Sequence, residues 1–136
     1  IRYVQEKMNS GEVDEQEVKQ SYFFRLREYL CLRANLYREL RQTQNAIDDW
    51  NELMRLGRIL NKRDRFEMNS YYLPLRAQTY AEGGLWKEAI GDYKEYVKTS
   101  PGDEKERKKL IEILRTCPDP KFLDPAFAQK LEEQTP

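Results

Sequence analysis

Histidine is absent from the 136 residues of this chain, and that absence limits the chemistry that its other side chains could perform. Histidine is the commonest general base, the usual partner of a serine or cysteine nucleophile, and the commonest neutral metal ligand. The 24 carboxylates could still transfer protons, but the Gly83–Gly84 pair is too short to form a phosphate-binding loop. We therefore expect a protein without catalytic residues, metal site or cofactor.

Two cysteines, Cys31 and Cys117, are the remaining candidates for redox or metal chemistry. They lie too far apart to match a metal-binding or redox motif. A single disulfide between them is one alternative, and two free thiols in a reducing compartment are the favoured one. The compartment stays open, because a chain that opens at Ile1 could have lost a targeting segment upstream. No apolar run reaches the length of about 18 residues that a membrane span needs.

Charged residues that recur at a fixed spacing are more informative. Arg33 and Arg76 lie 43 residues apart, inside the stretches LCLRANLYRE and LPLRAQTYAE, which are identical at six of ten positions. Each arginine is followed sixteen residues later by an aspartate, Asp49 or Asp92, within NAIDDWNEL or EAIGDYKEY. One unit is thus written twice, and an internal period of this size predicts stacked structural repeats.

The elements that position these charges are two helices in each copy. Each copy has two apolar runs of helical spacing with a short break between them. In the second copy, Leu73, Ala77 and Tyr80 share one stripe, and Gly83–Gly84 closes the first helix. Each copy is therefore predicted to be a helical hairpin.

In an antiparallel hairpin that turns between the two runs, each arginine should face its aspartate across the helix packing. We predict two equivalent ion pairs, Arg33–Asp49 and Arg76–Asp92, at or near the rim of the hairpin. The alternative is that both arginines extend into water along their apolar stems.

The spacing inside each copy resembles the tetratricopeptide repeat (TPR). With Ser70 as the first position, the second copy matches the family pattern at Ala77, Tyr80, Gly84, Trp86, Ala89, Tyr93 and Pro101. With Arg27 as the first position, the first copy matches at Ala34, Tyr37, Ala46 and Trp50, and departs at Arg41 and Arg58. Small residues let two helices approach closely while aromatic residues fill the holes beside them. We expect the four alanines to be buried.

The resemblance implies one all-α domain over residues 1–136, a TPR-like helical-hairpin solenoid with an N-terminal extension and C-terminal capping helices. Its parts are repeat 1 (27–60), an elongated connection (61–69), repeat 2 (70–103), a capping helix (103–116) and a tail with a short helix (117–136). The connection is expected to consist of two lengthened helices that turn near residues 61–64. Pro74 is expected to kink the helix that contains it.

Signals outside the repeats are helical too. The first repeat helix should begin well before Arg27, and a short helix should precede it and end at Asn9–Gly11. Asp103 and Glu106 predict a capping box for the capping helix. Asp124 as N-cap, with proline at the first helical position, predicts a last short helix.

The resemblance also implies a function: the family binds peptides or protein segments in a groove lined by the first helix of each hairpin. We expect a non-catalytic scaffold or adaptor. Mapped by position, its candidate partner-binding residues are Asn35, Arg38, Tyr71, Gln78, Lys105 and Lys109. The lysines favour an acidic segment of the partner.

Three other functions are weighed against the groove. The chain could be a structural subunit or assembly factor that uses its convex face or its elongated hairpin, since Tyr and Trp are favoured interface anchors. It could clamp the acidic tail of a chaperone, but Cys31 and Leu75 replace a Lys and an Asn of that clamp. RNA binding is disfavoured by two repeats and a net charge of zero. The oligomeric state is not predicted.

Overall fold

The computed structural model describes residues 2–11, 14–60 and 65–134, and within these the protein is all-α with no strand. Every segment that the sequence predicts to be helical is a helix where it falls inside these ranges. The elements are α1 (Arg2–Asn9), α2 (Glu15–Glu39), α3 (Thr43–Leu60), α4 (Arg65–Glu82), α5 (Trp86–Thr99), α6 (Glu104–Thr116), the 3-10 turn η1 (Pro120–Phe122) and α7 (Pro125–Glu133).

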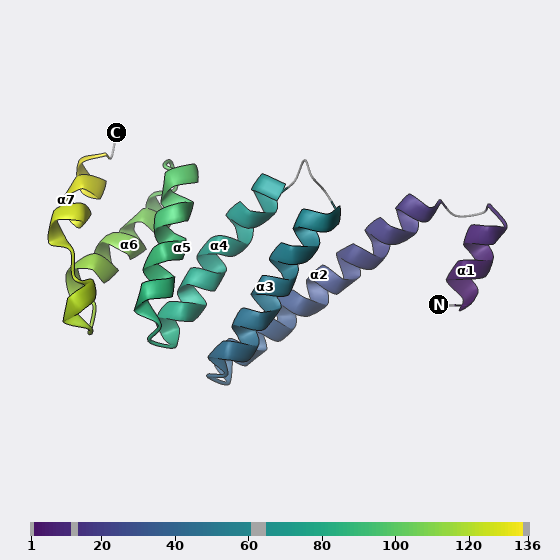
Figure 1. Cartoon of the computed structure of the whole chain (residues 1–136), viewed down its shortest axis with the longest axis horizontal. Coiled ribbons are helices and arrows are strands. Elements are labelled where there is room, and N and C mark those ends of the chain that lie inside the picture. Colours follow the sequence, from purple (N-terminus) through teal and green to yellow (C-terminus); the bar gives the residue numbers. More distant parts are fainter. Residues whose placement is uncertain (1, 12–13, 61–64, 135–136) are drawn as a thin grey trace.

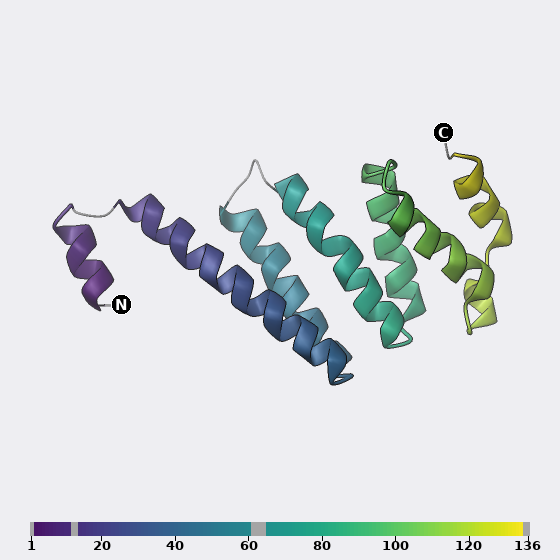
Figure 2. The same cartoon turned by 180° about the vertical axis from the view of Figure 1, so that it is seen from behind.

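From α2 onward, each helix packs against the next one in the chain. The helices therefore follow one another in a row, with the two chain ends at opposite ends of it (Figure 1). Seen from behind, α2, α4 and α6 form the near layer, with α3 and α5 behind them (Figure 2). This arrangement is compatible with a helical repeat, in which the first helices of successive hairpins share one face.

The alanines of the repeat pattern lie where the two helices of each hairpin meet. All four are fully buried: Ala34, Ala46, Ala77 and Ala89. A methyl group leaves room for the facing helix, so large side chains can fill the space on either side. The indole of Trp50 is fully buried in the first cluster, together with Leu53, Leu73 and Tyr72.

The joint between the two repeats is a polar contact inside this apolar cluster. The Trp50 indole Nε1 on α3 donates to Thr79 Oγ1 on α4 over 2.9 Å, and the Thr79 hydroxyl donates to the Leu75 carbonyl over 2.7 Å. The rings of Trp50 and Tyr72 lie 6.1 Å apart. A buried indole N–H needs an acceptor, so this bond fixes how α3 sits on α4.

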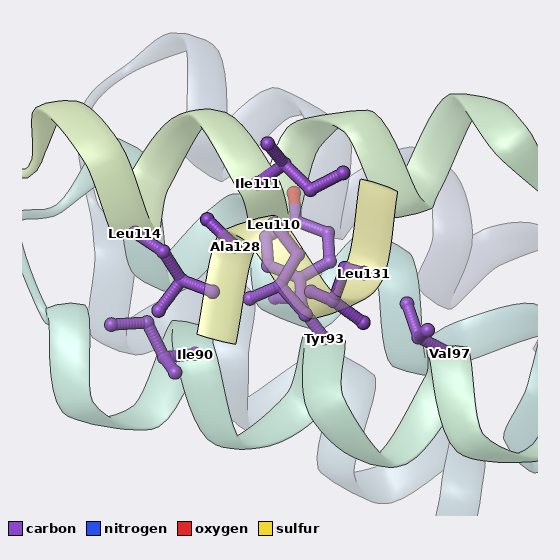
Figure 3. Packing of buried hydrophobic residues seen from close by; sticks show 9 residues of the cluster. Ile90, Tyr93, Val97, Leu110, Ile111, Leu114, Ala128 and Leu131 are labelled. Carbon is purple, nitrogen blue, oxygen red and sulfur yellow. The ribbon is translucent and has the colours of Figure 1, made fainter. Parts of the chain in front are cut away.

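A second cluster closes the other end of the row. Figure 3 shows its side chains converging from α5, α6 and α7, with the Tyr93 ring among them. Its buried members are Ala77, Ile90, Tyr93, Val97, Leu110, Ile111, Leu114, Ala128 and Leu131. The capping helix and the last short helix therefore extend the core of the repeats.

Both predicted ion pairs are present and bidentate. Arg33 donates to Asp49 from Nε (2.9 Å) and Nη2 (2.6 Å), and Arg76 donates to Asp92 from Nε (2.7 Å) and Nη2 (2.9 Å). The side chains are 40% and 5% exposed in the first pair and 20% and 11% in the second. The aspartate in each pair raises the pKa of its arginine above the ordinary value.

The same motif extends to the tyrosine four residues after each arginine. The Arg33 guanidinium lies 5.8 Å from the Tyr37 ring centroid, and that of Arg76 lies 6.0 Å from the Tyr80 ring centroid. A planar guanidinium can use its edge for a carboxylate and its face for an aromatic ring. Each hairpin thus carries one Arg–Tyr–Asp unit, which sets the register of its two helices.

The turns inside the two hairpins share one backbone geometry on different residues. In the first, Gln42 N–H donates to the Tyr37 carbonyl (2.8 Å) and Arg41 N–H to the Arg38 carbonyl (3.0 Å). The equivalent bonds in the second involve Leu85 and Gly84. This is a Schellman helix end, which requires a left-handed residue. Gly84 has φ +74°, but Arg41 has φ 59° without being a glycine.

The helix boundaries agree with several sequence predictions. Helix α2 begins twelve residues before Arg27, and α3 and α4 both continue into the stretch between the repeats. The turn expected at residues 61–64 lies outside the described residues. Asp124 caps α7 by accepting from the Phe127 N–H (3.0 Å). Pro74 lies inside α4, and the kink expected at this residue stays a prediction. The division of the chain into repeats, connection, capping helix and tail also stays a prediction.

The predicted capping box at α6 is only half formed. The Asp103 carboxylate accepts from the Glu106 N–H over 3.3 Å, as an N-cap should. The Glu106 side chain pairs with Lys109 instead, and the Asp103 N–H donates to the Ser100 carbonyl. A backbone acceptor has therefore taken the place of the carboxylate.

We expect Arg41→Gly to raise the free energy of unfolding by about 0.5–1 kcal/mol, because glycine adopts the left-handed conformation without the penalty that a Cβ brings. Gly84→Ala is the matched substitution in the other hairpin and should lower stability by a similar amount. A Cβ at Gly84 meets open space, so its effect is purely conformational. Chemical denaturation of both variants tests the pair; equal shifts of the same sign would contradict it.

Double-mutant cycles with Arg→Gln and Asp→Asn should give a coupling energy of about 1–2 kcal/mol for Arg76–Asp92 and about half that for Arg33–Asp49. Arg76 is less exposed than Arg33, and it also donates from Nη1 to Asn51 Oδ1 over 2.8 Å. The measurement is urea denaturation of the single and double variants. A larger coupling in the first hairpin would reverse this ranking.

Candidate functional site

The near layer of helices carries one connected polar network, centred on Glu82. Arg38 on α2 donates to the Glu82 carboxylate on α4 from Nε (3.2 Å) and Nη2 (2.5 Å). The remaining Nη1 of Arg38 donates to Asn35 Oδ1 over 3.0 Å, and Gln78 Nε2 donates to Glu82 Oε1 over 3.1 Å. These bonds join the first helices of the two repeats: Arg38 and Gln78 meet at the Glu82 carboxylate, and Asn35 is linked to it through Arg38.

The network holds Glu82 in its ionised form. Hydrogen bonds from Arg38 lower the pKa of the Glu82 carboxyl most, with smaller contributions from Gln78 and the charge of Lys109 on α6. Asn35, Arg38 and Gln78 are thus brought together around Glu82, whereas Lys109 pairs with Glu106 on α6.

A second carboxylate lies at the α6 side of the cluster. Glu106 is buried, and its Oε1 accepts from Lys109 Nζ over 3.3 Å. Its other oxygen, Oε2, is buried and has no hydrogen-bond partner among the described residues. A buried acceptor without a hydrogen bond lowers the stability of the fold. The contact with Lys109 therefore reduces the free-energy cost of burying this carboxylate.

The hydroxyl of Tyr93 lies among these charges. Burial raises the pKa of Tyr93 most, the charges of Glu106 and Glu82 raise it further, and that of Arg38 lowers it. Beside the network, a cleft of about 530 Å³ opens where the first hairpin turn meets the end of α4. Its lining includes Arg38, Arg41, Thr43, Glu82 and Gly83.

The other two predicted site residues lie outside the cluster but on the same helix faces. Tyr71 is two helical turns before Gln78 on α4, and Lys105 is one turn before Lys109 on α6. Tyr71 is 65% exposed and makes an edge contact with the Tyr72 ring at 5.1 Å. Lys105 is exposed. They extend the face without being tied into its hydrogen bonds.

The structure adds two residues that are not among the predicted partner-binding residues, Glu82 and Glu106. The sequence predicts a helix-cap role for Glu106 and no contact for Glu82. A pairing signal could have found Glu82, since it lies four residues after Gln78 in the α4 sequence. Nothing in the sequence shows that Arg38 reaches across 44 positions to it.

No group of three or more Asp, Glu or Cys side chains within the described ranges could hold a metal ion. Both cysteines are free thiols; burial raises the pKa of Cys31, while a hydrogen bond with Tyr72 lowers it. Among the helices that the structure describes, none combines the length and apolar character needed to cross a membrane.

No protein-family model, no curated protein and no solved structure matches the chain.

Substitutions of Lys109 and Lys105 should change the free energy of unfolding by different amounts, although both are predicted site residues. Lys109→Met should lower the free energy of unfolding by about 1–2 kcal/mol, because it leaves both oxygens of the buried Glu106 carboxylate without a partner. Lys105→Met should change it by less than about 0.5 kcal/mol, since its side chain is exposed. Thermal and urea denaturation measure both; a silent Lys109 variant would show that Glu106 is satisfied in another way.

Proposed function

We propose that this chain is a TPR-type, non-catalytic scaffold that binds a segment of another protein along the face of α2, α4 and α6. The observation that carries the proposal is the convergence of three predicted groove residues, Asn35, Arg38 and Gln78, on one polar network beside a cleft. Two equivalent Arg–Tyr–Asp hairpins support the repeat assignment.

The charges of this face divide into two groups with different roles. Arg38 and Lys109 are already paired with Glu82 and Glu106, so they position the helices and are poor sites for a partner carboxylate. Lys105 and Lys108 are exposed on the first turns of α6. An acidic partner segment would therefore meet the lysines at the α6 end and the aromatic Tyr71 near the start of α4.

A selection from a displayed random-peptide library on the full chain tests this proposal. We expect enrichment of acidic peptides with micromolar affinity, whose binding weakens about tenfold in Lys105→Glu and falls as salt rises. Tyr71→Ala should weaken the same peptides, because it removes an exposed aromatic contact. Lys98→Glu is the matched control: it reverses an exposed lysine on α5, in the other layer, and should leave affinity unchanged.

Two outcomes would overturn the groove assignment. One is that no peptide is enriched. The other is that enriched peptides bind Lys105→Glu, Tyr71→Ala and the wild type equally, which would place binding on another face.

A further inference from the structure

The outer face of α2 carries an exposed apolar stripe that begins in its middle and runs to its C-terminal end. Its members are Tyr29, Leu32, Leu36 and Leu40, which are 56%, 67%, 57% and 65% exposed. Spacings of three and four residues put them on one side of the helix, over a length of about 16 Å. Helix α2 also exposes Tyr22 (69%) and Phe24 (51%) nearer its N-terminal end, so exposed apolar side chains are concentrated on this helix.

The second repeat shows what packs on the positions equivalent to this stripe. The equivalent positions on α4, 43 residues later, are Tyr72, Leu75, Thr79 and Gly83. Tyr72 and Thr79 are each 1% exposed, and Leu75 is packed against the first core cluster. In the second repeat Tyr72 and Thr79 are therefore buried, Leu75 is partly buried, and Gly83 is exposed, whereas all four equivalent positions of the first repeat are exposed.

Helix α3 provides that cover on α4. Its Trp50 stacks near Tyr72 and donates to Thr79, and its Thr43 packs so closely on Gly83 that an added Cβ there would lie 2.6 Å from Thr43 Cγ2. It runs antiparallel to α4 and lies beside it along its length (Figures 1 and 2). Among the described helices, none lies on the equivalent exposed face of α2, where Leu36 and Leu40 stand in place of Thr79 and Gly83.

The described helices of this chain do not supply the missing cover. Helix α1 lies beyond the N-terminal end of α2 in both views, and its eight residues span about 12 Å (Figures 1 and 2). The face of α3 that would fit is already occupied by α4. At the far end of the row, the exposed side of α7 carries Gln129, Lys130, Glu132 and Glu133, so a second copy stacked head to tail would bring polar groups to the stripe.

We propose that the stripe Tyr29–Leu40 is a docking site for an amphipathic α-helix of a partner protein, which lies antiparallel on α2 as α3 lies on α4. The differences between the two faces define its chemistry. Leu36 replaces Thr79 and offers no hydrogen-bond acceptor, so the partner needs an aliphatic or phenyl side chain where α3 has an indole. Leu40 replaces Gly83, so the partner needs a small residue where α3 has Thr43.

This site goes beyond the proposed function and does not depend on it. Asn35 and Arg38 of the polar network point from a different side of α2 than Leu32 and Leu36, because their positions are rotated about 100° or more from the centre of the stripe. A segment in the groove and a helix on the stripe could therefore bind at once.

A peptide derived from α3 is the direct probe. It comprises residues 43–60 with Trp50→Phe and Thr43→Ala, and a hydrocarbon staple joins the exposed positions 44 and 48 to hold it helical. Titrated into the intact chain, it should bind with micromolar affinity, and the same peptide with Trp50 retained should bind several-fold more weakly because its N–H is buried without an acceptor.

Variants of the intact chain locate the site. Leu32→Glu combined with Leu36→Glu should weaken the peptide at least about tenfold, without loss of helical circular dichroism, since both side chains are exposed. Leu123→Glu, another exposed leucine at the far end, is the control and should bind normally. Lys105→Glu should also bind normally, which separates this test from that of the groove.

Three results would overturn the proposal. The peptide could fail to bind at about 1 mM, or it could bind the double-glutamate variant as tightly as the wild type. The third result is a wild-type dimer in sedimentation at micromolar concentration that the double-glutamate variant abolishes, because the stripe would then be a contact between two copies of α2. The expected result is a monomer with and without the substitutions.

Discussion

Helix α3 must pack on two neighbours at once, and the rest of the structure depends on that double contact. On one side its Ala46 and Asp49 meet α2, and on the other its Trp50 indole meets the Thr79 hydroxyl of α4. Because a buried N–H must find an acceptor, the Trp50–Thr79 bond allows one placement of the second hairpin relative to the first. That placement brings Arg38 within reach of Glu82 and aligns the first helices into one face.

The network on that face changes how its charges should be understood. Read along the sequence, Arg38 and Lys109 are free cations suited to an acidic ligand. In the structure each is paired with a carboxylate: Arg38 with Glu82, which joins α2 to α4, and Lys109 with Glu106 one turn earlier on α6.

The two repeats hold their helices together by the same contacts but have different surroundings. The positions at which they differ are candidates for a functional role. Arg41 takes the left-handed conformation that Gly84 takes in the other hairpin, at a conformational cost. Leu32, Leu36 and Leu40 remain in water where Leu75, Thr79 and Gly83 are packed. Rows of stacked repeats cover their terminal stacking surfaces with polar caps. At α2 the surface stays apolar, whereas α7 is polar.

The sequence by itself determined the helices, their order and the contacts inside each hairpin. These features depend on residues within about 25 positions of one another, because the geometry of one hairpin determines which of its residues are in contact. They are the helical period, caps such as Asp124, the buried alanines and the Arg–Asp register. Contacts between hairpins were decided only by the tertiary structure. Arg38–Glu82 and Trp50–Thr79 depend on how helices of different repeats are placed, and many pairings satisfy the same pattern. The exposed leucines of α2 could likewise not be told from core leucines, because periodicity marks an apolar face but does not say whether anything covers it.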